Sequence, residues 1–89
     1  MFLFSINAVS RQDQGEFNAG EEVPFIVYID FKDLFGAEQL ATVFVMREGF
    51  RDVKIIKRRQ IKIDAGMKKD PQIQQALDKG YCVQAFSAH

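Results

Sequence analysis

Apolar and polar side chains alternate along this chain with two different periods, and these periods divide it into strands and helices. Residues 2–9 carry apolar side chains at every second position, which predicts a strand with one buried face. Residues 24–31 are apolar at both parities, which is typical of a central strand covered on both sides. Residues 81–86 are a shorter apolar run and predict a last strand.

Two other segments carry the helical period. Residues 36–48 repeat apolar side chains at helical spacing, and Gly49 suits the residue that follows a helix with positive φ. The letters TVFVM inside this segment favour a strand, but the preceding Ala-Glu-Gln-Leu-Ala favours the helix. Asp70 and Pro71 are an N-cap residue and a first helical residue, so residues 71–79 predict a second helix that ends at a glycine.

Residues 51–64 predict a strand with an unusual charge pattern. Regular alternation would place Lys54, Arg58 and Lys62 on one face, and Lys57 and Arg59 on the other. Both parities are charged at residues 57–59, so one parity has to leave the core. We therefore expect an edge strand or a bend at this point.

The order β-β-α-β(-β)-α-β predicts a single small α+β domain over residues 1–89. We expect two helices packed on one face of a four- to five-stranded mixed sheet, with a ferredoxin-like split βαβ unit as the leading architecture. Residues 10–22 are polar and contain two glycines, which favours a flexible loop. Residues 87–89 are expected to fray.

Composition narrows the class of protein. The chain has 89 residues, nine of them phenylalanine, and a single cysteine that excludes an internal disulfide and suits a reducing cytoplasm. The first residues lack the pattern of a signal peptide, and no apolar run approaches the roughly 18 residues of a membrane span. We expect a soluble, cytoplasmic protein that contacts no membrane.

Candidate catalytic residues are few. The one histidine is the last residue, and Cys82 lies within an apolar strand, where a small buried side chain is the simpler interpretation. Asp30 and Asp33 flank the end of a central strand and form a possible Mg²⁺ pair, although Asp33 more simply begins a helix. The glycines form no phosphate-binding motif. We therefore expect no enzyme, no metal and no cofactor.

The strongest signal is a concentration of positive charge. Residues 47–69 hold nine of the twelve basic residues and three acidic ones, so they carry 9 − 3 = +6 in a chain of net charge zero. Such a stripe predicts phosphate contacts. The candidate phosphate-binding residues are Arg51, Lys54, Lys57, Arg58, Arg59, Lys62, Lys68 and Lys69. Phe50 and Tyr81 are candidates for stacking on bases.

Two functions are compatible with this basic segment, residues 47–69. The leading hypothesis is a nucleic-acid-binding domain, for DNA or RNA, in which residues 51–62 contact phosphates. The alternative is a protein-interaction or regulatory module whose stripe pairs with an acidic surface, such as the acidic first half of a sister molecule. A small, Phe-rich chain gains stability by burying more apolar surface, so we expect a homodimer formed through a sheet edge or the thin second helix.

Overall fold

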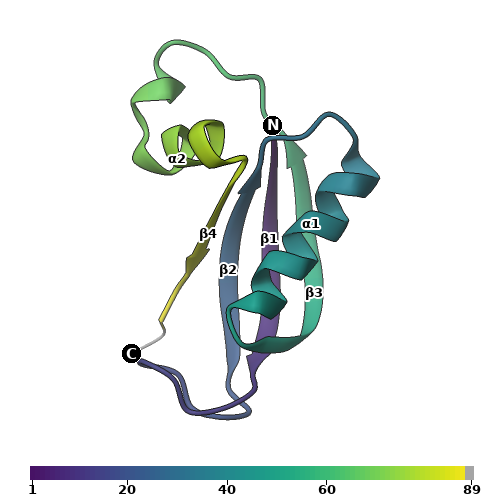
Figure 1. The fold of residues 1–89 in the computed structure, drawn as a ribbon, viewed down its shortest axis with the longest axis vertical. Coiled ribbons are helices and arrows are strands. Elements are labelled where there is room, and N and C mark those ends of the chain that lie inside the picture. Colours follow the sequence, from purple (N-terminus) through teal and green to yellow (C-terminus); the bar gives the residue numbers. More distant parts are fainter. Residues whose placement is uncertain (88–89) are drawn as a thin grey trace.

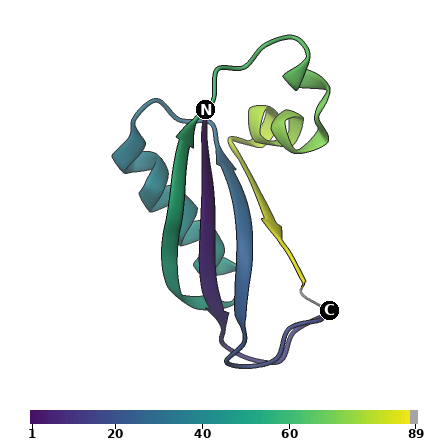
Figure 2. The same cartoon turned by 180° about the vertical axis from the view of Figure 1, so that it is seen from behind.

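The chain forms a four-stranded sheet with one helix on each face (Figure 1, Figure 2). The computed structural model describes residues 1–87. Its elements are β1 (Phe2–Ser10), β2 (Glu22–Ile29), α1 (Leu34–Arg47), β3 (Phe50–Gln60), the 3-10 helix η1 (Met67–Lys69), α2 (Pro71–Lys79) and β4 (Tyr81–Ala85). The predicted α+β class is confirmed. The predicted frayed end falls mostly on residues 88 and 89, outside the described residues.

The strand order is β3-β1-β2-β4, and every pair of neighbours is antiparallel. The mixed sheet that we expected is therefore wrong. β2 and β3 both run antiparallel to β1, so they run parallel to each other with β1 between them. Helix α1 connects them, which makes residues 22–60 a split βαβ unit.

The main core lies between α1 and the first face of the sheet. The side chains of β1 alternate so that Phe4 and Ile6 are buried against α1, and the register of β2 adds Phe25 and Val27 to the same face. Helix α1 contributes the buried residues Ala37, Ala41 and Val45. Two alanines in this stripe let the helix approach the sheet closely, because interaxial distance depends on the side chains at the contact.

The second helix covers the opposite face. Tyr28 pairs with Leu3 on β1 and with Cys82 on β4, so these three side chains point away from α1. Ile73 of α2 lines a pocket with Leu3 and Tyr28. The prediction that both helices share one face is therefore wrong. The physical reason is that β2 is apolar at both parities, so its second face also needs cover.

Capping residues fix the ends of both helices. The Asp33 carboxylate accepts a hydrogen bond of 2.7 Å from the Gly36 amide, and Gly49 follows the helix with φ of +98°. The Asp70 carboxylate accepts one of 2.8 Å from the Gln72 amide. The predicted caps are confirmed, although α1 begins two residues earlier than the predicted segment. Among residues 1–87, neither helix has the length and apolar character needed to cross a membrane.

The loop between β1 and β2 is held by hydrogen bonds. The Gln14 amide donates to the Ser10 hydroxyl and to the Gly49 carbonyl, at 3.0 and 3.1 Å. Phe17 lies edge-on against Phe50, with ring centroids 5.9 Å apart. The loop is thereby attached to the turn between α1 and β3.

Candidate nucleic-acid interface

The basic strand β3 is an edge strand with two irregularities in its pairing with β1. Ser5 faces Lys57 while Ile6 faces Ile55, so Ile56 is an extra residue, and it is 52% exposed. A second extra residue lies between Arg51 and Lys54, where Asp52 has φ of +52°. Both are β-bulges, and each reverses the alternation of the residues that follow it. The predicted edge or bend close to residues 57–59 is confirmed.

The bulges gather four cations on one face. Arg51, Lys54, Lys57 and Arg59, which we call the β3 cation column, pair in turn with Val9, Asn7, Ser5 and Leu3. These β1 partners are two residues apart and face away from α1, so the column has an even pitch of about 6.8 Å and spans about 20 Å. All four cationic residues are exposed.

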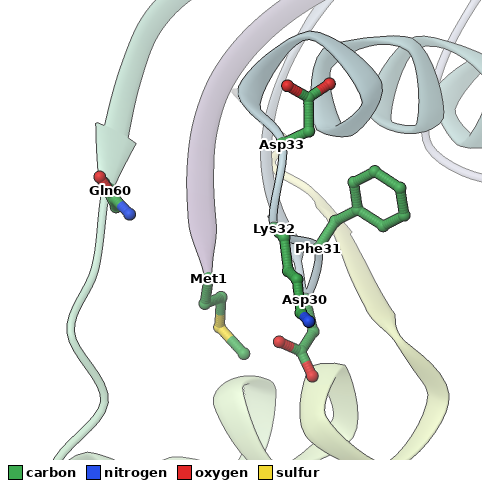
Figure 3. A pocket seen from close by; sticks show the side chains of 6 residues that line it. All are labelled: Met1, Asp30, Phe31, Lys32, Asp33 and Gln60. Carbon is green, nitrogen blue, oxygen red and sulfur yellow. The ribbon is translucent and has the colours of Figure 1, made fainter.

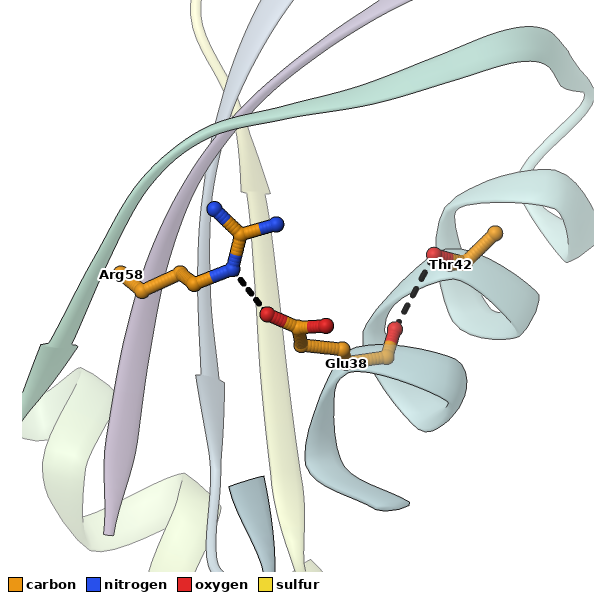
Figure 4. A network of polar contacts seen from close by, with 3 residues as sticks. All are labelled: Glu38, Thr42 and Arg58. Atoms are coloured by element: carbon orange, nitrogen blue, oxygen red, sulfur yellow. Dashed lines mark hydrogen bonds and ion pairs between the residues drawn. The ribbon is translucent and has the colours of Figure 1, made fainter. Parts of the chain in front are cut away.

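Arg58 lies on the other face. It pairs with Phe4 in the sheet register and forms an ion pair with Glu38 of α1, drawn in Figure 4. The prediction that Lys54, Arg58 and Lys62 share one face is wrong, because the bulge at Ile56 changes the parity between Lys54 and Arg58. Thr42, also on α1, donates a hydrogen bond of 3.0 Å to the Glu38 carbonyl.

Three of the four cations in the β3 cation column have no acidic partner among residues 1–87. Arg51 forms an ion pair with its neighbour Asp52. Within residues 1–87, the two ion pairs involve neither Lys54, Lys57 nor Arg59. Three cations therefore face solvent without a carboxylate partner in the described part of the chain, which is the condition for a strong interaction with an external anion.

The other predicted phosphate-binding residues lie beyond the strand. Lys62 lines a pocket together with Arg59, so it lies close to the end of the column. Lys68 and Lys69 belong to η1, just ahead of α2, and both are exposed. The structure thus brings Arg51, Lys54, Lys57, Arg59 and Lys62 to one side of the sheet and places the η1 lysines on a separate element.

The two predicted stacking residues are not available to bases. Phe50 is 3% exposed and lies edge-on against Phe25, with ring centroids 4.8 Å apart. Tyr81 stacks on Phe44 of α1 at 4.0 Å, on the face opposite the column. Both predictions are wrong, because the phenylalanine-rich core uses these rings. Tyr28 is a partly exposed aromatic residue on the sheet face opposite α1, which we call the open face. The apolar pattern of residues 24–31, which has apolar side chains at both parities, indicated this second face.

The pocket beside the N-terminus of α1 contains the possible Mg²⁺ pair. It has a volume of about 740 Å³ and is lined by Met1, Asp30, Phe31, Lys32, Asp33 and Gln60. Figure 3 shows that the Asp30 and Asp33 carboxylates point in opposite directions. Asp33 is engaged in capping α1. Among residues 1–87, no cluster of three His, Cys, Asp or Glu side chains is arranged to hold a metal ion.

Two titratable groups lie beneath α2. Burial raises the pKa of the Cys82 thiol, the charge of Asp70 raises it further, and Lys79 opposes the change. Burial also raises the pKa of the Tyr28 phenol, with smaller contributions from Asp70 and Cys82. A buried thiol with a raised pKa is a poor nucleophile at neutral pH. Cys82 is thus a packing residue in this structure.

Comparisons with protein-family models, with curated proteins and with solved structures give no significant match to this chain. Its own geometry and charge therefore carry the functional argument.

Proposed function

We propose that this protein binds nucleic acid through the open face of its sheet, in the cytoplasm and without catalysis. One observation supports the proposal above all: the β3 cation column presents four basic side chains at an even pitch of about 6.8 Å. A strand of stacked nucleotides rises about 3.4 Å per residue, so one cation would meet every second nucleotide. The contacts are to phosphates, which applies to DNA and RNA alike.

Binding measured against salt concentration tests the proposal. Fluorescence anisotropy with a labelled oligonucleotide should show affinity at low salt that falls steeply as salt rises, because bound phosphates release counterions. The triple variant Lys54→Ala, Lys57→Ala, Arg59→Ala should bind at least about tenfold more weakly. It should also reduce the slope of log K against log salt by about 2, from about 0.7 per lost contact on a single strand.

A charge-matched control separates the column from net charge. Arg11, Arg58 and Lys79 are exposed and lie outside the column, so changing all three to alanine removes the same charge. This control should retain most of the affinity. Absence of binding at low salt, or equal losses in the two triple variants, would refute the role of the column. Binding of an acidic protein instead of nucleic acid would support the interaction module.

The homodimer is the second part of the proposal. Pairing of two β3 edges would oppose basic strands, and bulges with lysines are features that protect an edge. The outward side of α1 is a better contact. Phe35, Val43 and Met46 are exposed there, and Phe35 is 67% exposed. At 100° per residue they lie opposite the buried stripe of the same helix.

Charge indicates how two α1 helices would meet. The N-terminal end of α1 carries exposed Lys32 and Asp33, and its C-terminal end carries exposed Arg47 and Glu48. An antiparallel pair brings Lys32 to the partner copy's glutamate and Asp33 to its arginine, so both contacts are attractive. The same pairing places Phe35 against the methionine of the second copy, a favourable sulfur–aromatic contact. Both cation columns remain on the outside.

A further inference from the structure

The end of the β3 cation column leads into a pocket between α2 and the sheet. This pocket has a volume of about 390 Å³ and is lined by Leu3, Tyr28, Arg59, Gln60, Ile61, Lys62, Met67 and Ile73. Its lining residues Leu3, Ile61 and Lys62 belong to the start of β1 and to the loop that leads to η1. Figure 2 shows that this loop leaves the sheet beside the start of β1. Its size falls within the usual range for small-molecule sites.

A second hollow connects the pocket to the column. It has a volume of about 260 Å³ and is lined by Leu3, Ser5, Lys57, Arg58 and Arg59. Leu3 and Arg59 line both hollows. A chain of phosphates that follows the column therefore arrives at the mouth of the pocket, where Arg59 and Lys62 supply two cations.

The lining has two chemical parts. Leu3, Ile61, Met67 and Ile73 supply apolar and sulfur surface, and Tyr28 supplies an aromatic ring. Arg59 and Lys62 supply positive charge beside them. A flat, aromatic group attached to a phosphate satisfies both parts, since aromatic rings stack on Tyr or Met and the phosphate pairs with the cations.

We infer that this pocket receives one unpaired base, and that the protein therefore selects single-stranded nucleic acid over duplex. The inference rests on the proposed function, because the column has to bring the strand to the pocket. In a duplex the bases are stacked and paired, and extruding one costs a few kcal/mol. A single strand presents its bases at little cost, so the pocket adds affinity for single strands alone.

Three probes of equal length separate base from backbone: a single strand, its perfect duplex, and a single strand of abasic sugar-phosphate. The single strand should bind at least about tenfold more tightly than the abasic strand, since stacking of one base contributes about 1–3 kcal/mol. Equal affinity for all three probes, with normal salt dependence, overturns the pocket and leaves the proposed function standing. No binding of any probe at low salt refutes both.

Two variants test the pocket directly. Met67→Gln and Tyr28→Leu should each reduce the preference for the single strand over the abasic strand by at least about threefold, without changing the affinity for the abasic strand. Leu77→Gln is the matched control, because Leu77 is an exposed α2 residue that does not line the pocket. An unchanged preference in both pocket variants overturns the inference.

A fluorescence readout tests the contact without changing any residue that lines the pocket. The chain has two tyrosines and no tryptophan, so Tyr81→Phe leaves Tyr28 as the only strong intrinsic fluorophore. Stacking of a base on Tyr28 should quench its emission when the single strand is added, whereas the abasic strand should leave it unchanged. Binding of the single strand without quenching contradicts a base in contact with Tyr28.

Discussion

At the scale of single residues, Arg58 and Arg59 are neighbours in sequence with opposite environments. Arg58 pairs with Glu38 on the α1 side, and Arg59 pairs in register with Leu3 on the open side. We predict that Arg59→Ala lowers nucleic-acid affinity several-fold and reduces the salt slope by about 0.7. Arg58→Ala should barely change binding and should cost at most about 1 kcal/mol of stability, as exposed ion pairs do. Anisotropy and urea unfolding measure the two effects; equal binding losses would contradict the assignment.

Asp70 combines two roles at one position. Its carboxylate caps α2, and its charge acts on Cys82 and Tyr28 beneath that helix. Asp70→Ala should lower the free energy of unfolding by about 1 kcal/mol, whereas Asp70→Asn should cost only a few tenths, since asparagine is also a good N-cap. Urea denaturation measures both. Asp78→Ala, at an exposed position later in the same helix, is the control and should change stability little.

The raised pKa values of Cys82 and Tyr28 predict a loss of stability in alkaline solution. Both groups are neutral when protonated, and burial raises each pKa in the folded state. The native protein therefore retains these protons to higher pH than the unfolded chain. The contribution is fully present below about pH 8.5, the pKa of an unfolded thiol, and is lost as pH rises further. Urea unfolding at neutral and alkaline pH should show this decline, and Cys82→Ser should make it smaller.

At the scale of elements, local signals in the sequence were sufficient to predict the helices and where they end. Asp70, Pro71 and the glycines at positions 49 and 80 marked helix ends that the structure contains. The bulges in β3 were not predictable in position, because an extra residue in a strand has no required side chain. The doubled charge at residues 57–59 showed only that the strand had to be irregular or at an edge. The face of each cation depended on bulges placed by pairing with β1.

Deleting the extra residue tests the role of the bulge at Ile56. Removal of Ile56 leaves Ile55 and Lys57 on their present faces, because the register of β1 already treats them as successive partners. Stability should change by less than about 1 kcal/mol, and the β3 cation column should still bind. Deletion of Ser5, which pairs with Lys57 and is not itself an extra residue, should move Phe4 out of the core and cost about 3 kcal/mol or more. Urea unfolding compares the two, and equal costs would contradict the role of Ile56.

At the scale of the whole molecule, the two helices lie on opposite faces of the sheet and cover them to different extents. Helix α1 covers the first face along β1, β2 and β3, whereas the shorter α2 packs against β2 and β4 on the second. The sequence did not reveal this arrangement, because a thin apolar stripe such as Ile73 and Ala76 fits either face. The exposed part of the second face is what makes the cation column accessible, and the outward side of α1 is left as a separate apolar surface.

This separation predicts that dimerisation and nucleic-acid binding can be changed independently. Val43→Glu should raise the dissociation constant of the dimer at least about tenfold, because it places a charge in the apolar contact. Leu77→Glu, an exposed position on α2, is the control and should leave the dimer intact. Sedimentation equilibrium without nucleic acid measures both, and a wild-type protein that stays monomeric at high concentration would contradict the dimer.

A charge exchange identifies the second copy as the partner. Glu48→Lys should weaken the antiparallel dimer by placing a lysine opposite Lys32 of the other copy, and adding Lys32→Glu should restore it. Each change is favourable within one helix, since a cation suits the C-terminal end and an anion the N-terminal end, so weaker association cannot be attributed to loss of α1. Anisotropy with single-stranded oligonucleotide should give the same intrinsic affinity for all three proteins, because both residues flank α1, which covers the face opposite the β3 cation column, and neither belongs to the column. Failure of the double variant to restore association would place the contact elsewhere on the molecule.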